Sequence, residues 1–189
     1  NNMNKKRGEY GYIAARKKKT LLGTIIIALI GVAIFLVGLF LNKMSNRNLF
    51  TIIAVLAVLP AAKQLVAFIV LFPFKTTQKE RYQKAKDMIG EEMKLYSDLV
   101  ITSPEKIMHL DLAAVGNGHV ICLLGQGKQE LNYVRKYLTE GVHNWGRNYK
   151  VKVVDSEKTF LGELSKVQPV EVDRDEEDKV NSYLLSLIV

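Results

Sequence analysis

The chain has 189 residues, of which 48% are hydrophobic and 24% are charged, and it carries a formal net charge of +8. These averages, with a mean hydropathy of +0.04, match those of an ordinary soluble protein because a polar remainder dilutes two long apolar runs. The single cysteine, Cys122, excludes a disulfide framework within the chain and fits a reducing compartment.

The first part of the chain predicts a basic arm followed by two membrane spans. The arm covers residues 1–19, and apolar runs follow over 20–41 and 49–74. Each run exceeds the roughly 20 apolar residues that a helix needs to cross a hydrocarbon core. The arm ends in four basic residues, Arg16, Lys17, Lys18 and Lys19. We therefore expect a transmembrane helical hairpin over 20–74.

Basic residues flank both runs on the same side of the expected membrane. The arm is rich in Lys and Arg, and Lys75 begins a second basic stretch, whereas the connecting loop has only Lys43 and Arg47. The positive-inside rule then predicts a multi-pass protein of the cell membrane with both termini in the cytoplasm. We expect Lys75 and the four basic residues that end the arm to contact anionic lipid headgroups, which favours lipid over nucleic acid as their partner.

Small residues recur along the first run at spacings that keep them near one helix face. They are Thr24, Ala28, Gly31 and Gly38. Such a stripe allows helices to approach closely in lipid, which predicts a packing face within the hairpin or between copies. The alternative interpretation is that Gly and Ala are simply frequent in membrane helices.

The second run contains Pro60, Lys63 and Gln64 near its middle. A lysine at the bilayer centre costs about 2.5–3.5 kcal/mol on insertion scales, and a proline frees a backbone carbonyl one turn earlier. One interpretation puts Lys63 in a water-filled or inter-subunit site that binds an anion, a lipid headgroup or a partner carboxylate. The other bends or tilts the helix at Pro60, so that Lys63 extends to the interface.

The remaining residues, 76–189, predict a cytosolic α/β domain with a mixed sheet of about four strands and flanking helices. Helical spacing of apolar residues predicts helices, and short apolar runs between turn signals predict strands. The expected helices cover 76–96, 129–144, 156–166 and 175–189, the last of them amphipathic with an acidic first turn. The expected strands cover 98–103, 107–115, 119–124 and 149–154, with a tight Asn-Gly turn at 116–118.

The order helix, three strands, helix, strand over about 78–155 resembles the core of the restriction-endonuclease-like superfamily. In the active pattern of that family, an Asp on the second strand precedes Glu or Gln, any residue, then Lys on the third. Asp111, Gln126 and Lys128 occupy those places. The resemblance implies phosphodiester hydrolysis with a magnesium ion held by acidic side chains, and Lys128 positioning the attacking water. Because Gln126 replaces the acid, a non-catalytic fold of this kind or another small α/β domain is the favoured interpretation.

The layout of two spans and a small domain is also similar to small bacterial membrane proteins labelled O-GlcNAc-transferase-like. The domain is too small for a nucleotide-sugar transferase fold, so this likeness implies a bacterial membrane protein without transferase chemistry. The sequence assigns no metal ligand and no cofactor, because His109, His119 and His143 lack metal-ligand spacing.

The sequence therefore favours a protein that is not an enzyme. We expect a membrane scaffold that is anchored by the hairpin, forms homo-oligomers or binds a membrane-protein partner, and recognises a partner through its α/β domain. The alternative is a channel-like or transporter-like assembly with Lys63 and Gln64 in the membrane path. A membrane-tethered nuclease that uses Asp111, Gln126 and Lys128 is a more distant alternative.

Overall fold

A computed structural model describes residues 3–41 and 49–189 of the chain. The chain divides into two compact units. The hairpin unit comprises residues 1–3 and 15–73, and the α/β unit comprises residues 4–14 and 74–189. Residues 42–48, which include Lys43 and Arg47 of the expected connecting loop, lie outside the described residues.

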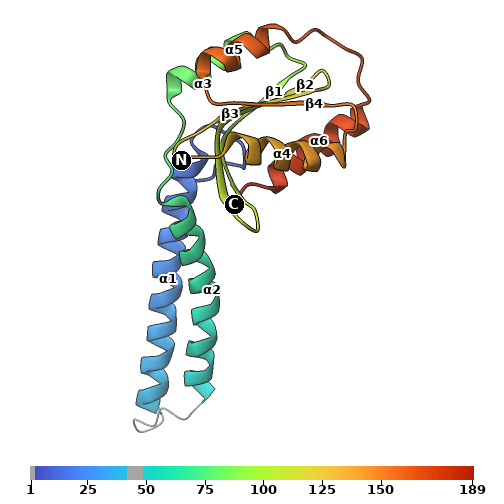
Figure 1. Cartoon of the computed structure of the whole chain (residues 1–189). Helices are drawn as coiled ribbons and strands as arrows, with labels where there is room; N and C mark the ends of the chain where they lie inside the picture. Colours follow the sequence, from blue (N-terminus) through green and yellow to red (C-terminus); the bar gives the residue numbers. More distant parts are fainter. Residues whose placement is uncertain (1–2, 42–48) are drawn as a thin grey trace. The chain divides into compact units, whose positions relative to one another are not determined.

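Two long apolar helices form the hairpin unit, except that the first residues of the first helix, 12–14, belong to the α/β unit (Figure 1). Helix α1 is Tyr12–Leu41 and helix α2 is Leu49–Leu71. Helix α1 begins eight residues before the expected start at residue 20, because the basic residues that precede the apolar run are good helix formers. Helix α2 ends three residues before the expected residue 74, since Pro73 disfavours helical geometry in the residue before it.

The α/β unit contains a four-stranded mixed sheet with the strand order β1-β2-β3-β4. Neighbouring strands are antiparallel from β1 to β3, whereas β4 is parallel to β3. The strands are β1 (Lys94–Thr102), β2 (Ile107–Gly116), β3 (His119–Leu124) and β4 (Lys150–Val154). The helices are α3 (Lys79–Met88), α4 (Leu131–His143), α5 (Glu157–Ser165) and α6 (Arg174–Ser186). The parallel pair requires a crossover, which α4 supplies.

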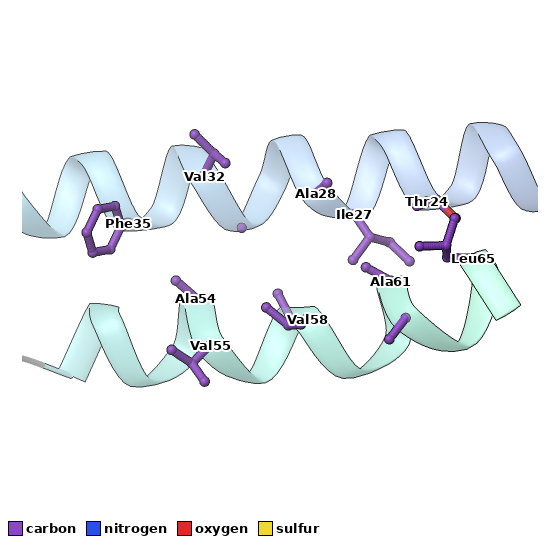
Figure 2. Close-up of a pocket in the computed structure, with 13 residues that line it drawn as sticks. Thr24, Ile27, Ala28, Val32, Phe35, Ala54, Val55, Val58, Ala61 and Leu65 are labelled. Atoms are coloured by element: carbon purple, nitrogen blue, oxygen red, sulfur yellow. The ribbon is translucent and has the colours of Figure 1, made fainter.

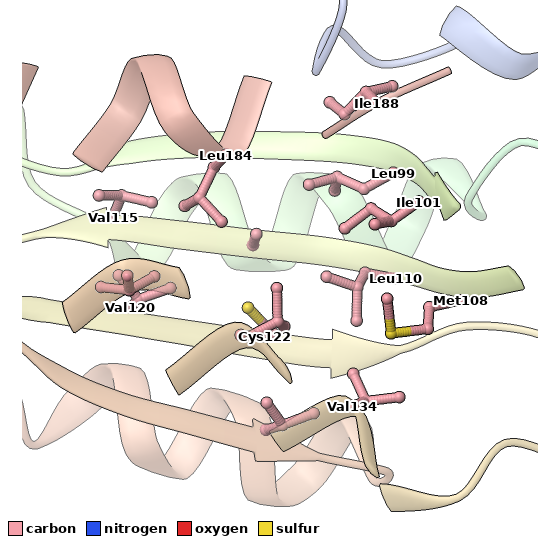
Figure 3. Packing of buried hydrophobic residues seen from close by; sticks show 14 of the residues in the cluster. Leu99, Ile101, Met108, Leu110, Val115, Val120, Cys122, Val134, Leu184 and Ile188 are labelled. Atoms are coloured by element: carbon pink, nitrogen blue, oxygen red, sulfur yellow. The ribbon is translucent and has the colours of Figure 1, made fainter. Parts of the chain in front are cut away.

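Each face of the sheet carries its own hydrophobic core. On one face, α4 and α6 cover a cluster in which Leu110, Cys122 and Leu184 are fully buried (Figures 1 and 3). On the other face, α3 and α5 cover a smaller cluster that includes Ala85, Leu112 and Phe160. Burial on both faces explains why β2 and β3 are apolar along almost their whole length.

The alternation of buried side chains changes phase in the middle of β1 and of β2. In β2, Leu110 packs on the α4 and α6 face and Leu112 on the opposite face, and the pairing with β3 shifts register between these two residues. The residue at the shift is Asp111. Directly across the β1–β2 pair lies Asp98, which has a φ of 60°. Two acidic residues thus occupy one shared irregularity in the sheet.

Several sequence predictions are confirmed. Strand 119–124 has the expected bounds, and Asn117 and Gly118 adopt the positive φ values expected for the tight turn. The predicted C-terminal helix over 175–189 is present as α6, which ends earlier, at Ser186, because Ile188 pairs with Ile101 of β1. Asp173 caps the start of α6, where its carboxylate accepts a hydrogen bond from the Asp175 N–H at 2.9 Å. These features depend on local chemistry, which the sequence carries directly.

The predicted helix over 76–96 is wrong at its C-terminal end. Helix α3 ends at Met88, and β1 already begins at Lys94. Met93 is buried against the α3 and α5 side of the sheet. Its apolar side chain fits a core position in a helix as well as in an extended segment, so its hydrophobicity did not distinguish the two. The expected start of the strand at residue 98 is four residues late, because Asp98 resembles a strand-terminating residue but lies inside β1.

Candidate functional site

Helices α1 and α2 enclose an apolar groove of about 480 Å³ (Figure 2). Thr24, Ala28 and Gly31 of the predicted small-residue stripe line this groove, and Gly38 is buried. A Cβ at Gly31 would lie 3.4 Å from the Ala57 Cβ, which is ordinary close contact. The stripe therefore faces α2 along much of its length and leaves an open apolar groove beside the contact.

The three residues predicted to interrupt the second run have different surroundings. Pro60 lies inside α2, which remains helical from Leu49 to Leu71. Gln64 is half-buried against Gly23, where a Cβ would lie 3.5 Å from the Gln64 Cδ. Lys63 is exposed and has no hydrogen-bond or ion-pair partner within residues 3–41 and 49–189.

The basic residues at the end of the predicted arm also differ from one another. Lys17 donates a hydrogen bond from Nζ to the Phe72 carbonyl at 2.7 Å, and so satisfies a carbonyl directly after α2. Arg16 is half-buried, whereas Lys18 and Lys19 are exposed in the hairpin unit. Lys75, in the α/β unit, is also exposed.

Asp98 is the centre of a buried polar cluster in the α/β unit. Its Oδ2 accepts a hydrogen bond from the Ile13 N–H at 3.2 Å. Its Oδ1 accepts from the Thr77 N–H at 2.9 Å and from the Ser97 hydroxyl at 3.1 Å. The side chain is fully buried, so these donors compensate for the cost of removing a carboxylate from water. Asp98 therefore fixes residues before the hairpin and residues after it to the same strand.

Asp111 forms the second half of this cluster. Its Oδ2 is bound by Arg81 Nη1, and Arg81 Nε donates to Glu157 Oε2 at 3.0 Å. The hydrogen bond from Arg81, supported by Lys84, lowers the pKa of Glu157. The backbone of Asp111 is also held, because the Thr77 hydroxyl donates to its carbonyl at 2.9 Å. The guanidinium thus connects α3, β2 and α5 in one ion-pair network.

His109 organises the loop between β3 and α4. Its backbone carbonyl accepts from the Gly125 N–H and from Gln129 Nε2, each at 2.8 Å, and its N–H donates to Gln129 Oε1 at 2.8 Å. The ring Nδ1 accepts from the Gln126 N–H at 2.9 Å. Contact with the ring is so close that a Cβ at Gly125 would lie 2.1 Å from Nδ1. Glycine is therefore required at residue 125.

One pair of buried polar atoms in this cluster has no hydrogen-bond partner. His109 Nε2 and Asp111 Oδ1 lie 3.9 Å apart, beyond hydrogen-bond range, and neither is satisfied by another described residue. The Phe74 ring packs over the imidazole with a centroid distance of 4.9 Å. Burial lowers the pKa of His109, and the negative charges of Asp111 and Asp98 offset that effect only in part.

The residues of the predicted nuclease motif have unlike environments. The Asp111 carboxylate is buried and bound by Arg81, whereas the Gln126 and Lys128 side chains are exposed. Because His109 Nδ1 accepts an N–H, the neutral ring carries its proton on Nε2, which leaves no lone pair there for a metal ion. Among the described residues, no group of three His, Cys, Asp or Glu side chains is arranged to hold a metal. The geometry therefore gives Asp111 an ion-pairing role.

Cys122, His119 and His143 have environments that support the fold and do not indicate a reactive site. Cys122 is fully buried, and burial raises the pKa of its thiol to about 12, which disfavours the reactive thiolate. His119 Nδ1 lies 2.8 Å from the Asn117 carbonyl, and His143 Nε2 lies 2.9 Å from the Tyr149 carbonyl. Each ring thus has a backbone partner close to it in the chain.

Sequence reasoning missed the parts of the cluster that come from distant segments. Asp98, Thr77 and Arg81 were not singled out, because nothing in their local pattern shows that they meet. An Asp between apolar residues inside a strand was the one available signal, since an unpaired carboxylate is costly in such a position. Comparison with known proteins finds no matching family model, no matching curated protein and no matching solved structure.

Proposed function

We propose that the protein is an integral membrane scaffold, anchored by the α1 and α2 hairpin in a bacterial cell membrane with both termini in the cytoplasm. The observation that carries this proposal is the exposure of large apolar side chains around both helices. Phe40 of α1 is 83% exposed and Leu59 of α2 is 68% exposed. Helices of a soluble core would bury such side chains, whereas lipid would cover them.

The charges support the same orientation. Lys18, Lys19 and Lys75 are exposed and would lie near the cytoplasmic leaflet, where each basic residue gains about 1 kcal/mol from anionic lipid. Phosphodiester chemistry receives little support, because the Asp111 carboxylate is bound by Arg81. We therefore assign the α/β unit a binding role in preference to a catalytic one.

Cysteine labelling in intact cells tests the topology. Asn46→Cys should react with a membrane-impermeant maleimide from outside, and Lys94→Cys should react only after the membrane is permeabilised. Native Cys122 is fully buried and serves as the unlabelled background. Labelling of Lys94→Cys in intact cells, or release of the protein by alkaline carbonate, would contradict the proposal.

Homo-oligomers form part of the proposal because the groove between α1 and α2 remains open beside their contact. Small residues such as Ala28 and Ala61 line it and would allow a neighbouring helix to approach closely. Crosslinking in native membranes should yield dimers or larger species in the wild type and fewer in Ala28→Leu. Only monomers in the wild type would exclude this part of the proposal.

The alternative function is an oligomeric channel or transporter with Lys63 and Gln64 in the membrane path. Lys63 favours it, because an exposed lysine without a described partner near the middle of α2 needs water, an anion, a headgroup or another protein. Ion or solute flux through proteoliposomes that Lys63→Leu abolishes would support this function. Oligomers that persist in Lys63→Leu, without any flux in the wild type, would favour the scaffold.

A further inference from the structure

The imidazole of His109 is the acceptor for one backbone N–H in the loop that joins β3 to α4. The donor is the Gln126 N–H, at 2.9 Å from Nδ1. The ring is fully buried, so water cannot replace that acceptor without a movement of the loop. The contact therefore depends on a free lone pair on the imidazole.

Protonation removes that lone pair. Both nitrogens of an imidazolium carry hydrogen, so a ring flip cannot restore an acceptor toward Gln126. Two N–H donors would then face each other at a distance suited to a hydrogen bond. The Gln126 N–H must then move away from the ring, because it loses its acceptor and faces a second donor.

The other anchors of the loop do not depend on the charge of the ring. The Gly125 N–H and Gln129 Nε2 both donate to the backbone carbonyl of His109. The ends of the loop therefore stay attached when the ring is protonated. At the tip, residues 126–128, the Gln126 carbonyl also accepts from Gln129 Nε2 at 3.3 Å, whereas the Gln126 N–H bonds to Nδ1.

Two carboxylates, on β1 and β2, influence the charge of the His109 ring, and Arg81 modifies the effect of one of them. Asp111 lies on the same strand, with Oδ1 at 3.9 Å from Nε2, and Asp98 on β1 also favours the charged ring. Arg81 of α3 is bound to the other oxygen of Asp111 and reduces its attraction for the imidazolium. Phe74 packs its uncharged ring against the imidazole, and the side chain of Lys128 in the loop is exposed.

We infer that His109 is a pH-sensitive switch that holds the tip of the β3–α4 loop, residues 126–128, when neutral and releases it when protonated. The inference goes beyond the proposed scaffold function and does not depend on it. Release would free the exposed side chains of Gln126 and Lys128 to take new positions. Any partner that contacts this loop would then bind in a pH-dependent way.

The direction of the effect follows from burial. The pKa of His109 is lowered from its ordinary value of 6.5 in the closed loop, so acid favours the open loop, in which the ring is hydrated. The closed loop is most stable above that ordinary value, and its stability falls as the pH drops below it. Each pH unit below it lowers the ratio of closed to open loop by at most tenfold, because one proton is taken up on opening.

Amide hydrogen exchange of the full chain in detergent micelles, resolved by NMR, tests the switch. After correction for intrinsic exchange rates, the protection of the Gln126 amide should fall between pH 7.5 and pH 5.5, by up to about tenfold. The Gly125 amide is bonded to a carbonyl and should keep its protection. Equal loss at both amides would mean that the whole loop unfolds, and no loss at Gln126 would also overturn the inference.

Two variants separate the switch from general acid sensitivity. His109→Asn keeps an acceptor near the Nδ1 position but does not titrate, so the pH dependence at Gln126 should disappear. His119→Asn removes a histidine whose Nδ1 lies 2.8 Å from the Asn117 carbonyl in its own turn, and it should leave the pH dependence unchanged. If His109→Asn does not fold, the tautomer and pH titration of the wild-type His109 ring, followed by NMR, test the inference instead. Ring ¹⁵N shifts should then show the Nε2–H tautomer at pH 7.5, and a proton on Nδ1 at that pH would overturn the inference.

Discussion

The hairpin unit and the α/β unit distribute polar and apolar groups in opposite ways. The hairpin unit exposes Phe40 and Leu59, which an aqueous protein would bury. The α/β unit buries Asp98 and His109, which an aqueous protein would normally expose. The helices of the hairpin unit can be predicted from composition alone, because long apolar runs are a property of the local sequence. The α/β unit depends on specific partners, because each buried polar group must find a donor or an acceptor.

The largest effect is expected at Asp98, which tests whether buried polar partners stabilise the α/β unit. Replacement by Ala would leave the buried N–H groups of Ile13 and Thr77 without an acceptor. We expect a loss of about 3 kcal/mol in the free energy of unfolding, since each unpaired buried donor costs about 1–3 kcal/mol. Fluorescence of Trp145, the only tryptophan, reports on the α/β unit during unfolding in detergent.

Asp98→Asn is the matched control for this change. It keeps one acceptor oxygen and tolerates the φ of 60° at this position, so it should be more stable than Asp98→Ala. Equal stability of Asp98→Ala and the wild type would mean that the cluster does not hold these segments.

Lys63 tests the hairpin side of the comparison. If its side chain lies in hydrocarbon, Lys63→Leu should make insertion of the second span about 3 kcal/mol more favourable, on the scales that assign a central lysine 2.5–3.5 kcal/mol. Glycosylation mapping in a microsomal insertion assay measures this change. Gln64→Leu is the comparison variant and should have a smaller effect. An unchanged insertion free energy for Lys63→Leu would mean that the ammonium already reaches water.

Gly125 tests the packing around His109. A Cβ there would lie 2.1 Å from Nδ1, so Gly125→Ala must displace the ring or the loop, and overpacking of this kind costs about 1–3 kcal/mol. Gly162→Ala is the control, because nothing lies within 4 Å of the added Cβ. A helical site such as this gains up to about 1 kcal/mol from Ala. Both variants can be compared by the unfolding midpoint of Trp145 fluorescence, and equal midpoints would contradict the tight contact at His109.

The smallest effect is expected at the surface of the α/β unit. Hydrogen bonds from Lys152 and Lys166 lower the pKa of Glu163 from 4.5 to about 2. A carboxylate with a lowered pKa stabilises the fold above its ordinary pKa, and that stability is lost as the pH falls toward 2. Glu163→Gln should flatten this part of the stability profile only slightly, because exposed ion pairs contribute little. A large loss of stability at pH 7 would contradict that view.

The sequence by itself determined the elements whose cause is local. The two continuous apolar runs predicted two long helices, although their exact ends differ from those of the runs. Asn117 with Gly118 produces a tight turn through positive φ. Strand 119–124 followed from the apolar run after that turn. The end of α3 and the start of β1 could not be fixed in this way, because Met93 reaches the core from either backbone conformation.

Only the tertiary structure decided the polar cluster. Asp98 meets Ile13, which lies 85 residues away in the chain, and no pattern within either segment encodes that contact. The same holds for the contacts of His109 with the loop at Gly125 and Gln126. Nuclease-like spacing had suggested Gln126, with Asp111 and Lys128, as a reactive motif. Burial makes each unpaired polar atom costly, so the fold is stable only where distant segments bring the matching groups together.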